Sequence, residues 1–488
     1  MTPNTNNSIF TKYLRKLRHS ENKVDHVKPH KDIAKNEKTE FDRFRREEYS
    51  RIDESGTVYL DYAGAALYPR SLLIKHYEFL EKHILGNPHS ASSASMLSSQ
   101  VELQARQGVL DYFDADSDQY MVVFTSNASA GLKLVAEAYP FGPDKALILS
   151  EDSHNSLHGM RKYASQATAQ TIYYEVHDTG LKVTNATESG GHLAPSGERG
   201  LVVFTAQSNV TGIKQDLGLV EKARLAGFDT IVDIAALATT SRVSINSIKA
   251  DAAVVSFYKL FGYPTGLGAL IMKQKFAQKL RRPYFGGGTI ETVQVPGNNV
   301  TMTEGPSRST YKIFTSQDGT TNFLALPAVI YGLRFMDEHI DKLEVRVRTL
   351  IDFTRQALSI IRYKNGIRLV TIHGTDDAAR RGGTLALTFH KSNGDDVACE
   401  KIEVLANNEK ISLRSGCLCN PAMTAILLKR RNDIQTIGEH LTFSDLLEKM
   451  GVDSLGIVRI SFGIASNHED AKKFLSFAKR LATGLELD

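Results

Sequence analysis

Lys259 and Asp233 stand where two apolar, strand-like runs end, and both residue types can support covalent chemistry. Lys259 follows the run AAVVSFY, and Asp233 follows TIV, 26 residues earlier in the chain. An amine at the dry end of a core strand has a lowered pKa, which lets it form a Schiff base with an aldehyde cofactor. The alternative is a lysine that reaches from the strand end into solvent, and position alone leaves the two interpretations balanced.

Two other features favour the cofactor interpretation. Pyridoxal phosphate needs a carboxylate on its pyridine nitrogen to act as an electron sink, and Asp233 could supply that carboxylate. The segment FTSNASAGLKLV places small residues where a strand ends and a helix begins, and backbone amides at such a point suit a phosphate. Each feature is weak alone, because an aspartate after a strand is often a helix cap and a small-residue turn often serves packing.

The elements that would position these residues follow an alternating pattern from Val58 onward. Short apolar runs rich in β-branched residues are separated by segments with helical periodicity, which is typical of a parallel sheet covered on both faces. The strand-like runs are MVVFTS, KALILS, GLVVFTAQ, DTIVDIAA, DAAVVSFY and GLGALIM. The pattern predicts an α/β fold with a mostly parallel sheet.

The pattern changes after about residue 325, where a long helix-like stretch precedes mixed segments such as GTLALTFH and GIVRISFG. This change predicts a smaller α+β domain at the C-terminal end. We therefore expect a polar N-terminal extension at 1–50, a large cofactor-binding domain at 51–330 whose first residues join the small domain, and the small domain at 331–488. The extension reads as a solvated tail or a loosely docked helix.

Composition excludes several classes of protein. The net charge of the 488 residues is only +4, with acidic and basic residues interspersed, so a nucleic-acid partner is not expected. No apolar run reaches the roughly 18 to 20 residues that cross a bilayer, which predicts a cytoplasmic protein without membrane contact. Three cysteines are too few for a disulfide framework. Cys417 and Cys419 form a CxC without a second ligand pair, so no metal site is expected.

Many ordered segments resemble one enzyme family. In chain order they are YLDYAGAALYP, GNPHSAS, FTSNASAGLKLV, SEDSHNS, AQSNVTG, VDIAA, SFYKLFGYPTGLGAL, YFGGGT, QDGTTNF, LRSGCLCNPA and VRISFG. Over residues 55–480 the chain resembles the class V aminotransferases of fold type I, specifically the cysteine desulfurase branch. It is most similar to the N-terminal domain of eukaryotic molybdenum cofactor sulfurases.

The resemblance implies a pyridoxal phosphate cofactor and a role for each matching residue. Lys259 resembles the lysine that binds the cofactor, Asp233 the partner of the pyridine nitrogen, and His154 the residue that stacks on the ring. Asn209 matches the donor to the phenolic oxygen of the cofactor. The positions that match phosphate contacts are Ala128, Ser129 and Ser256, together with Thr320, whose contact is usually made across the interface of a homodimer.

The resemblance also implies sulfur chemistry on L-cysteine. Cys419 lies five residues after Arg414, the spacing at which this branch carries its nucleophile. Its thiolate would take the substrate sulfur as a persulfide and leave alanine, and a loop rich in Gly, Ser, Asn and Pro suits a mobile thiol. Arg459 matches the arginine that binds the substrate carboxylate, and Arg414 has a weaker claim. The alternatives are a small buried hydrophobe for the cysteine and a surface ion pair for the arginines.

Some positions depart from the family pattern. Thr424 replaces a cysteine of the sulfurases, and Ala236 replaces a glutamine of bacterial desulfurases. The chain ends at Asp488 without the domain that binds the molybdenum cofactor, so we expect sulfur transfer in trans, to that cofactor or to a carrier protein. The alternative functions are a pyridoxal phosphate-dependent carbon-sulfur lyase or aminotransferase, for which Cys419 would be dispensable, and a non-enzymatic scaffold.

Overall fold

The structure is a computed structural model of the chain, and the residues it describes are 30–88, 90–174, 176–177, 180–181, 199–286, 290–302, 319–435, 437–438, 441–452, 454–484 and 487. The chain forms two compact units, Met1–Glu47 and Glu48–Asp488. Helix α2 (His30–Ser55) contains non-helical backbone torsions at Tyr49. Most of the predicted N-terminal extension, residues 1–29, lies outside the described residues.

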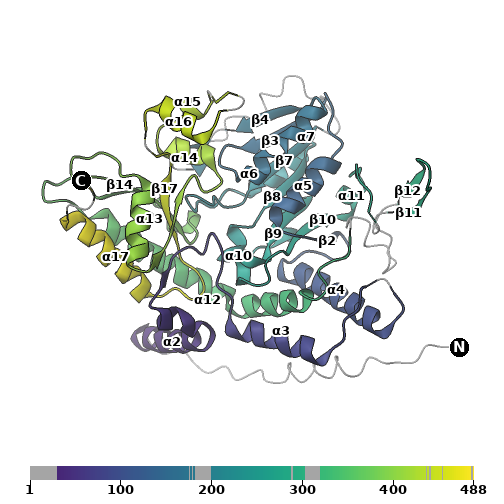
Figure 1. Cartoon of the computed structure of the whole chain (residues 1–488), viewed down its shortest axis with the longest axis horizontal. Coiled ribbons are helices and arrows are strands. Elements are labelled where there is room, and N and C mark those ends of the chain that lie inside the picture. Colours follow the sequence, from purple (N-terminus) through teal and green to yellow (C-terminus); the bar gives the residue numbers. More distant parts are fainter. Residues whose placement is uncertain are drawn as a thin grey trace. The chain divides into compact units, whose positions relative to one another are not determined.

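A seven-stranded sheet forms the centre of the second unit (Figure 1). Its order is β2 (Tyr120–Thr125), β10 (Gly268–Lys273), β9 (Ala252–Ser256), β8 (Asp229–Asp233), β7 (Gly200–Thr205), β3 (Ala146–Ser150) and β4 (Gln170–Tyr174). The five strands from β9 to β4 are parallel to their neighbours, and β10 is antiparallel to both β2 and β9. The predicted α/β fold with a mostly parallel sheet is therefore confirmed.

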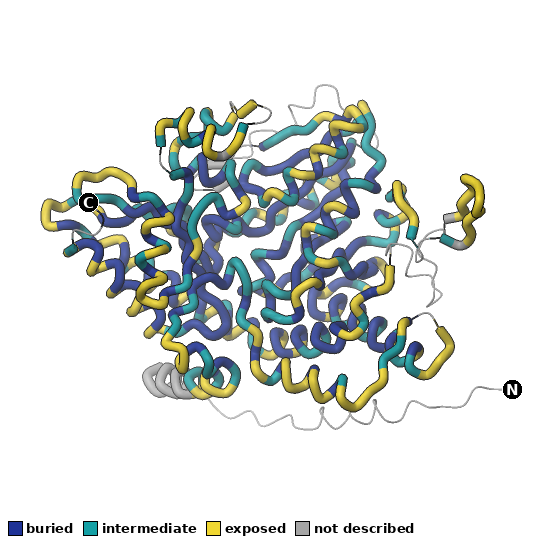
Figure 2. The backbone as a smooth tube through the Cα atoms, in the orientation of Figure 1, coloured by how far each residue is buried: buried dark blue, intermediate teal, exposed yellow. Residues whose placement is uncertain are grey.

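Burial on both faces explains why the strand-like runs are almost continuously apolar. Every residue of β3, β7 and β9 is buried, as the dark blue centre of Figure 2 shows. Helix α5 (Ala128–Ala138) packs on β2, β9 and β10 and contributes Leu132 and Val135 to this core. A Cβ on Gly131 of this helix would come within 3.1 Å of Val254, so a glycine allows the close approach.

Along the chain, a long helix links the seven-stranded sheet to a four-stranded sheet. Helix α12 (Leu326–Ser359) begins with a proline in its first turn and packs on α3 (Arg70–Lys82), α4 (Ser93–Tyr112) and α17 (His468–Thr483). The domain boundary predicted near residue 330 lies inside this helix, and residues 48–488 form one compact unit. That boundary stays a prediction.

The second sheet is antiparallel. Its order is β13 (Val370–His373), β14 (Thr384–Phe389), β17 (Ile457–Ser461) and β16 (Arg414–Gly416), and α13 (Cys399–Asn408) packs on β14, β16 and β17. Beside it, β1 (Val58–Tyr59) pairs in parallel with β15 (Ile411–Ser412). This pairing brings the start of the second unit to the segment that precedes Arg414.

Short elements complete the described part of the chain. The helices are α6 (Asn155–His158), α7 (Arg161–Gln166), α8 (Gly218–Leu225), α9 (Ile245–Ile248), α10 (Phe257–Phe261), α11 (Gln274–Ala277), α14 (Pro421–Leu427), α15 (Arg431–Gln435) and α16 (Phe443–Met450). The hairpins are β5 (Val176–His177) with β6 (Gly180–Leu181) and β11 (Ile290–Val293) with β12 (Val300–Met302). Among the described residues, none of these helices combines the length and the apolar character needed to span a membrane.

Candidate functional site

The candidate site lies at the carboxyl edge of the large sheet. Because parallel strands end at the same edge, the segments that follow β3, β7, β8 and β9 meet there. These segments carry four of the predicted residues. His154 follows β3, Asn209 follows β7, Asp233 ends β8, and Lys259 follows β9 on helix α10.

Lys259 lies in an environment that favours the neutral amine. Burial lowers the pKa of its ammonium group, the negative charge of Asp233 opposes this effect, and the positive charge of Arg459 adds to it. A lysine that reached solvent from the strand end would lose little of its hydration. Lys259 is half-buried at the end of its strand, so its amine is partly removed from solvent and lies within electrostatic reach of Asp233.

Asp233 and His154 flank this lysine. Asp233 Oδ1 accepts a hydrogen bond from Ala235 N at 2.9 Å, so one carboxylate oxygen holds the turn that follows β8. His154 caps helix α6, because its Nδ1 accepts a hydrogen bond from Ser156 N. Burial lowers the pKa of the His154 imidazole and the charge of Lys259 lowers it further, which favours a neutral ring.

The amino end of helix α5 forms the predicted phosphate position. Asn127 caps this helix by accepting a hydrogen bond from Ala130 N at 2.9 Å, and Ala128 N donates to Ser256 Oγ at 2.9 Å. The Ser129 and Ser156 hydroxyls are hydrogen-bonded to each other. The aligned amides of the first turn carry a partial positive charge that suits an anion. Because Ala128 is hydrogen-bonded to Ser256 and precedes Ser129, these three predicted phosphate contacts lie together.

Thr320 is the fourth predicted phosphate contact. Among the described residues, no hydrogen bond joins it to Ala128, Ser129 or Ser256. Its side chain is exposed, whereas the neighbouring Thr321 is buried and donates a hydrogen bond to Glu102 Oε1 at 3.1 Å. The role predicted for Thr320 requires a second copy of the chain. It stays a prediction.

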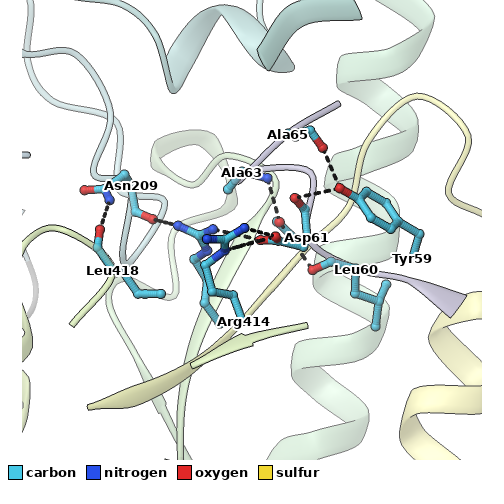
Figure 3. Close-up of polar contacts among 10 residues, drawn as sticks. Tyr59, Leu60, Asp61, Ala63, Ala65, Asn209, Arg414 and Leu418 are labelled. Carbon is cyan, nitrogen blue, oxygen red and sulfur yellow. Dashed lines mark hydrogen bonds and ion pairs between the residues drawn. The ribbon is translucent and has the colours of Figure 1, made fainter. Parts of the chain in front are cut away.

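Arg414 and Arg459 face each other across the second sheet as register partners on β16 and β17. Like charges in that arrangement repel, and the side chain of Arg459 is only 3% exposed. Asp61 accepts hydrogen bonds from both guanidinium groups, and its single negative charge offsets part of their repulsion; Figure 3 shows its contact with Arg414. Its Oδ1 accepts from Arg459 Nη2 at 2.9 Å, and its Oδ2 accepts from Arg414 Nη2 at 2.6 Å.

Backbone contacts fix the position of Asp61. Asp61 forms a parallel β-bridge with Ser461 of β17, and Ala63 N donates to Ser461 Oγ at 2.8 Å. A Cβ on Gly64 would come within 2.5 Å of the Asp61 carboxylate, so the turn needs a glycine at that position. The pairing of β1 with β15 therefore delivers a carboxylate between two arginines.

We expect Asp61→Ala to destabilise the fold, because it leaves the buried guanidinium of Arg459 without its compensating charge. Removing one partner of such a pair lowers the free energy of unfolding by about 3 kcal/mol. Urea unfolding followed by circular dichroism measures the change. Asp376→Ala is the matched control, because Asp376 pairs with Arg355 through a carboxylate that is 88% exposed. Equal losses in the two variants would contradict a special role for Asp61.

Cys419 and Cys417 differ in environment. Cys419 is exposed, and a thiolate at this position would act electrostatically on Lys259, Arg459 and Tyr258. Cys417 Sγ donates to Leu455 O at 3.0 Å, and burial raises the pKa of its thiol to about 11. At neutral pH only roughly one Cys417 in 10⁴ is therefore a thiolate. Cys399 is buried.

Asn209 connects the predicted cofactor position to the Cys419 segment. Its backbone carbonyl accepts from Arg459 Nη1 at 2.9 Å, and its side-chain Nδ2 donates to Leu418 O at 2.8 Å (Figure 3). An amide nitrogen carries two hydrogens, so one remains for the contact predicted with the phenolic oxygen of the cofactor.

Sequence reasoning did not single out three residues that organise this site. They are Asp61, Asp152 and Asn420, which stand in the motifs YLDYAGAALYP, SEDSHNS and LRSGCLCNPA. Each acts through a partner far away in the chain, and periodicity carries no signal for such pairs. A usable hint was the presence of two arginines in adjacent segments of the small domain, which would need a nearby carboxylate.

Comparison with known proteins gives three kinds of similarity. The family model for class V aminotransferases matches residues 58–474. Molybdenum cofactor sulfurase of Solanum lycopersicum is 31% identical over 473 residues, which cover 90% of this chain and 57% of that protein. The Bos taurus protein of the same name is 31% identical over 459 residues, covering 89% and 51%. The chain thus spans about half the length of the curated relatives it matches.

Solved structures share the fold. A cysteine desulfurase from Thermococcus onnurineus superposes with a TM-score of 0.72 at 22% identity, covering 91% of this chain and 98% of the other. A cysteine desulfurase from Escherichia coli superposes with a TM-score of 0.69 at 20% identity, covering 91% and 98%. At these identities the likeness concerns the fold.

Proposed function

Because the chain belongs to the class V aminotransferase family, as its motifs predicted, we propose that it is a pyridoxal phosphate-dependent cysteine desulfurase. The enzyme moves sulfur from L-cysteine to Cys419 and releases alanine. One observation carries the proposal: the segment of the exposed thiol Cys419 is hydrogen-bonded to Asn155 and Asn209, at the same carboxyl edge of the sheet as the half-buried Lys259.

The residues at that edge fit the cofactor. Lys259 supplies a desolvated amine for the aldehyde, and Asp233 lies close enough for its charge to act on that amine. The first turn of α5, with Ser129 and Ser256, suits the phosphate. When bound, pyridoxal phosphate acts as an electron sink for bonds at the carbon skeleton of an amino acid.

Other side chains around Lys259 would bind the substrate, transfer protons and hold the Cys419 segment. Arg459 supplies a guanidinium for the substrate carboxylate, with Arg414 beside it on the next strand. The neutral imidazole of His154 can take up or release a proton near Lys259. Asn209 holds both the Cys419 segment and Arg459 through hydrogen bonds.

The sulfur step balances without an external oxidant or reductant. The Cys419 thiolate attacks the substrate sulfur and forms an S–S bond, and the bond between that sulfur and the substrate Cβ breaks. The electron pair of the broken bond stays with the carbon fragment, which takes up a proton and leaves as alanine. The terminal sulfur of the Cys419 persulfide then passes to a thiol of a carrier protein by redox-neutral exchange, which frees the Cys419 thiolate, or to the molybdenum cofactor with two electrons from an external thiol reductant.

The cofactor assignment predicts a yellow protein whose visible band disappears on treatment with borohydride. The reduced adduct should map to Lys259 by peptide mass spectrometry, because Lys259 has the desolvated amine. Lys259→Ala should abolish this labelling. Lys273→Ala is the matched control, since Lys273 ends β10 at the opposite edge and pairs with Asp251. A colourless parent protein that cannot be reconstituted would refute the proposal.

A further inference from the structure

The segment Leu418–Asn420 is bound to the cofactor side of the site at three consecutive residues. Leu418 O accepts from Asn209 Nδ2 at 2.8 Å, and Cys419 O accepts from Asn155 N at 2.8 Å. Asn420 Nδ2 donates to Asp152 Oδ1 at 2.7 Å. The sequence suggested a mobile thiol, and the structure adds hydrogen bonds to the residues on both sides of that thiol.

The backbone of this segment needs such support. Leu418 and Cys419 have φ values of 56° and 55°, in the left-handed region that is unfavourable for residues with a Cβ. Such torsions persist only where the surroundings determine them. The three hydrogen bonds are contacts of that kind, and those made by Asn209 and Asp152 depend on side chains.

Asp152 is a buried carboxylate whose contacts support the backbone of the segment Leu418–Asn420. Its side chain is 1% exposed, and Oδ1 accepts from Ser208 Oγ at 2.9 Å as well as from Asn420. Oδ2 has no hydrogen-bond partner among the described residues. Burial raises the pKa of this carboxyl group to about 6, while the hydrogen bonds from Ser208 and Asn420 lower it. At neutral pH the bond to Asn420 is therefore mostly charge-assisted.

Asn420 uses its side chain fully. It is completely buried, it donates to Asn209 Oδ1 at 3.1 Å as well as to Asp152, and its Oδ1 accepts from Met423 N to cap helix α14. Asn420 is thus hydrogen-bonded both to residues at the carboxyl edge of the large sheet and to helix α14.

We infer that Asp152 is a positioning residue for the nucleophile: through Asn420 it holds the Cys419 segment against the cofactor pocket. This inference rests on the proposed function, because it takes Cys419 as the nucleophile. The fixed segment keeps the thiol within electrostatic reach of Lys259, where the substrate sulfur would lie. Release of the segment would lower the fraction of molecules in which the thiol can attack.

The test uses hydrogen exchange of the peptide that contains residues 417–420, in cofactor-loaded protein without substrate. Asp152→Ala should raise the exchange rate of these amides about tenfold, because a charge-assisted bond is lost. Asp152→Asn should bring exchange most of the way back to that of the parent, since the amide keeps an acceptor oxygen for Asn420 and loses only the charge. Asp251→Asn is the control, because Asp251 accepts from Thr230 at the opposite edge of the sheet.

Steady-state kinetics separate positioning from general damage. In Asp152→Ala, kcat with L-cysteine should fall about tenfold while KM changes less than about twofold, because Arg459 and Lys259 are untouched. Parent exchange and parent kcat in Asp152→Ala would overturn the inference, as would equal impairment of the Asp152→Asn variant. If Asp152→Ala does not fold, Asn420→Ala replaces it, and parent exchange in that variant would likewise overturn the inference.

Failure of the positioning inference can be distinguished from failure of the proposed function. The exchange experiment contains no substrate, so it reports on the Asp152–Asn420 contact whether or not the parent is a desulfurase. A parent protein without desulfurase activity would remove the proposed function, whereas exchange alone decides whether Asp152 holds the segment.

Discussion

Cys419→Ala should abolish formation of both persulfide and catalytic alanine from L-cysteine, while the protein still binds the cofactor. The reason is that only a thiolate can take the substrate sulfur, and Cys419 is the exposed thiol whose thiolate form would act electrostatically on Lys259. Lys259, Asp233 and Arg459 are unchanged in this variant. Alanine production and the mass of the Cys419 peptide, both measured after incubation with L-cysteine, report the two products.

Cys417→Ala is the matched control for that experiment. Its thiol is held by Leu455 O and has a pKa of about 11, so it is almost fully protonated at neutral pH and should contribute little to sulfur transfer. We expect turnover within about threefold of the parent, since the lost bond is a weak one to sulfur. Parent-level turnover in Cys419→Ala, with products of β-elimination or transamination, would replace the desulfurase assignment by a lyase or an aminotransferase.

Asp233→Asn should preserve the fold and the link of the cofactor to Lys259, but should lower kcat by about a hundredfold or more, as expected when a preorganised charge is removed. A neutral amide cannot hold the proton on the pyridine nitrogen, so the electron sink fails. The amide oxygen can still accept from Ala235 N, which keeps the turn after β8. Borohydride labelling of Lys259 measures the link to the cofactor, and steady-state kinetics measure the loss of kcat.

Asp229→Asn provides the comparison within the same strand. Asp229 begins β8 at the opposite edge, where it accepts from Tyr139 Oη at 2.9 Å and pairs with Lys279. Its substitution should affect stability and leave kcat close to that of the parent. If Asp233→Asn retained activity within threefold of the parent, Asp233 would be a turn residue and no more.

The sequence predicted the parallel core and the residues at its carboxyl edge, because runs such as GLVVFT and AAVVS are apolar on both faces. Once parallel pairing is assumed, the residues that end these strands must meet. Lys259 and Asp233 could therefore be placed together before any coordinates were known. The antiparallel direction of β10 could not, because GALIMK has the same apolar character as its parallel neighbours.

The contacts that hold the arginines and the thiol were outside the reach of sequence patterns. Asp61 with Arg459, and Asp152 with Asn420, are pairs of single polar residues that long-range packing brings together. Periodicity reports which face of an element is buried, but not which distant residue meets it. The expectation of a mobile Cys419 thiol rested on the chemistry of sulfur transfer and on composition, neither of which reveals the three hydrogen bonds of this segment; the mobility stays a prediction.

The contact between Asp61 and Arg459 spans 398 positions of the chain, and its consequence concerns the order of folding. During synthesis the segment with Asp61 leaves the ribosome 398 residues before Arg459 of β17. Pairings of such high contact order form late, because the intervening chain must first be ordered. The arginine environment is thus completed only after β17 has been translated, and a nascent chain that stops before β17 cannot assemble it.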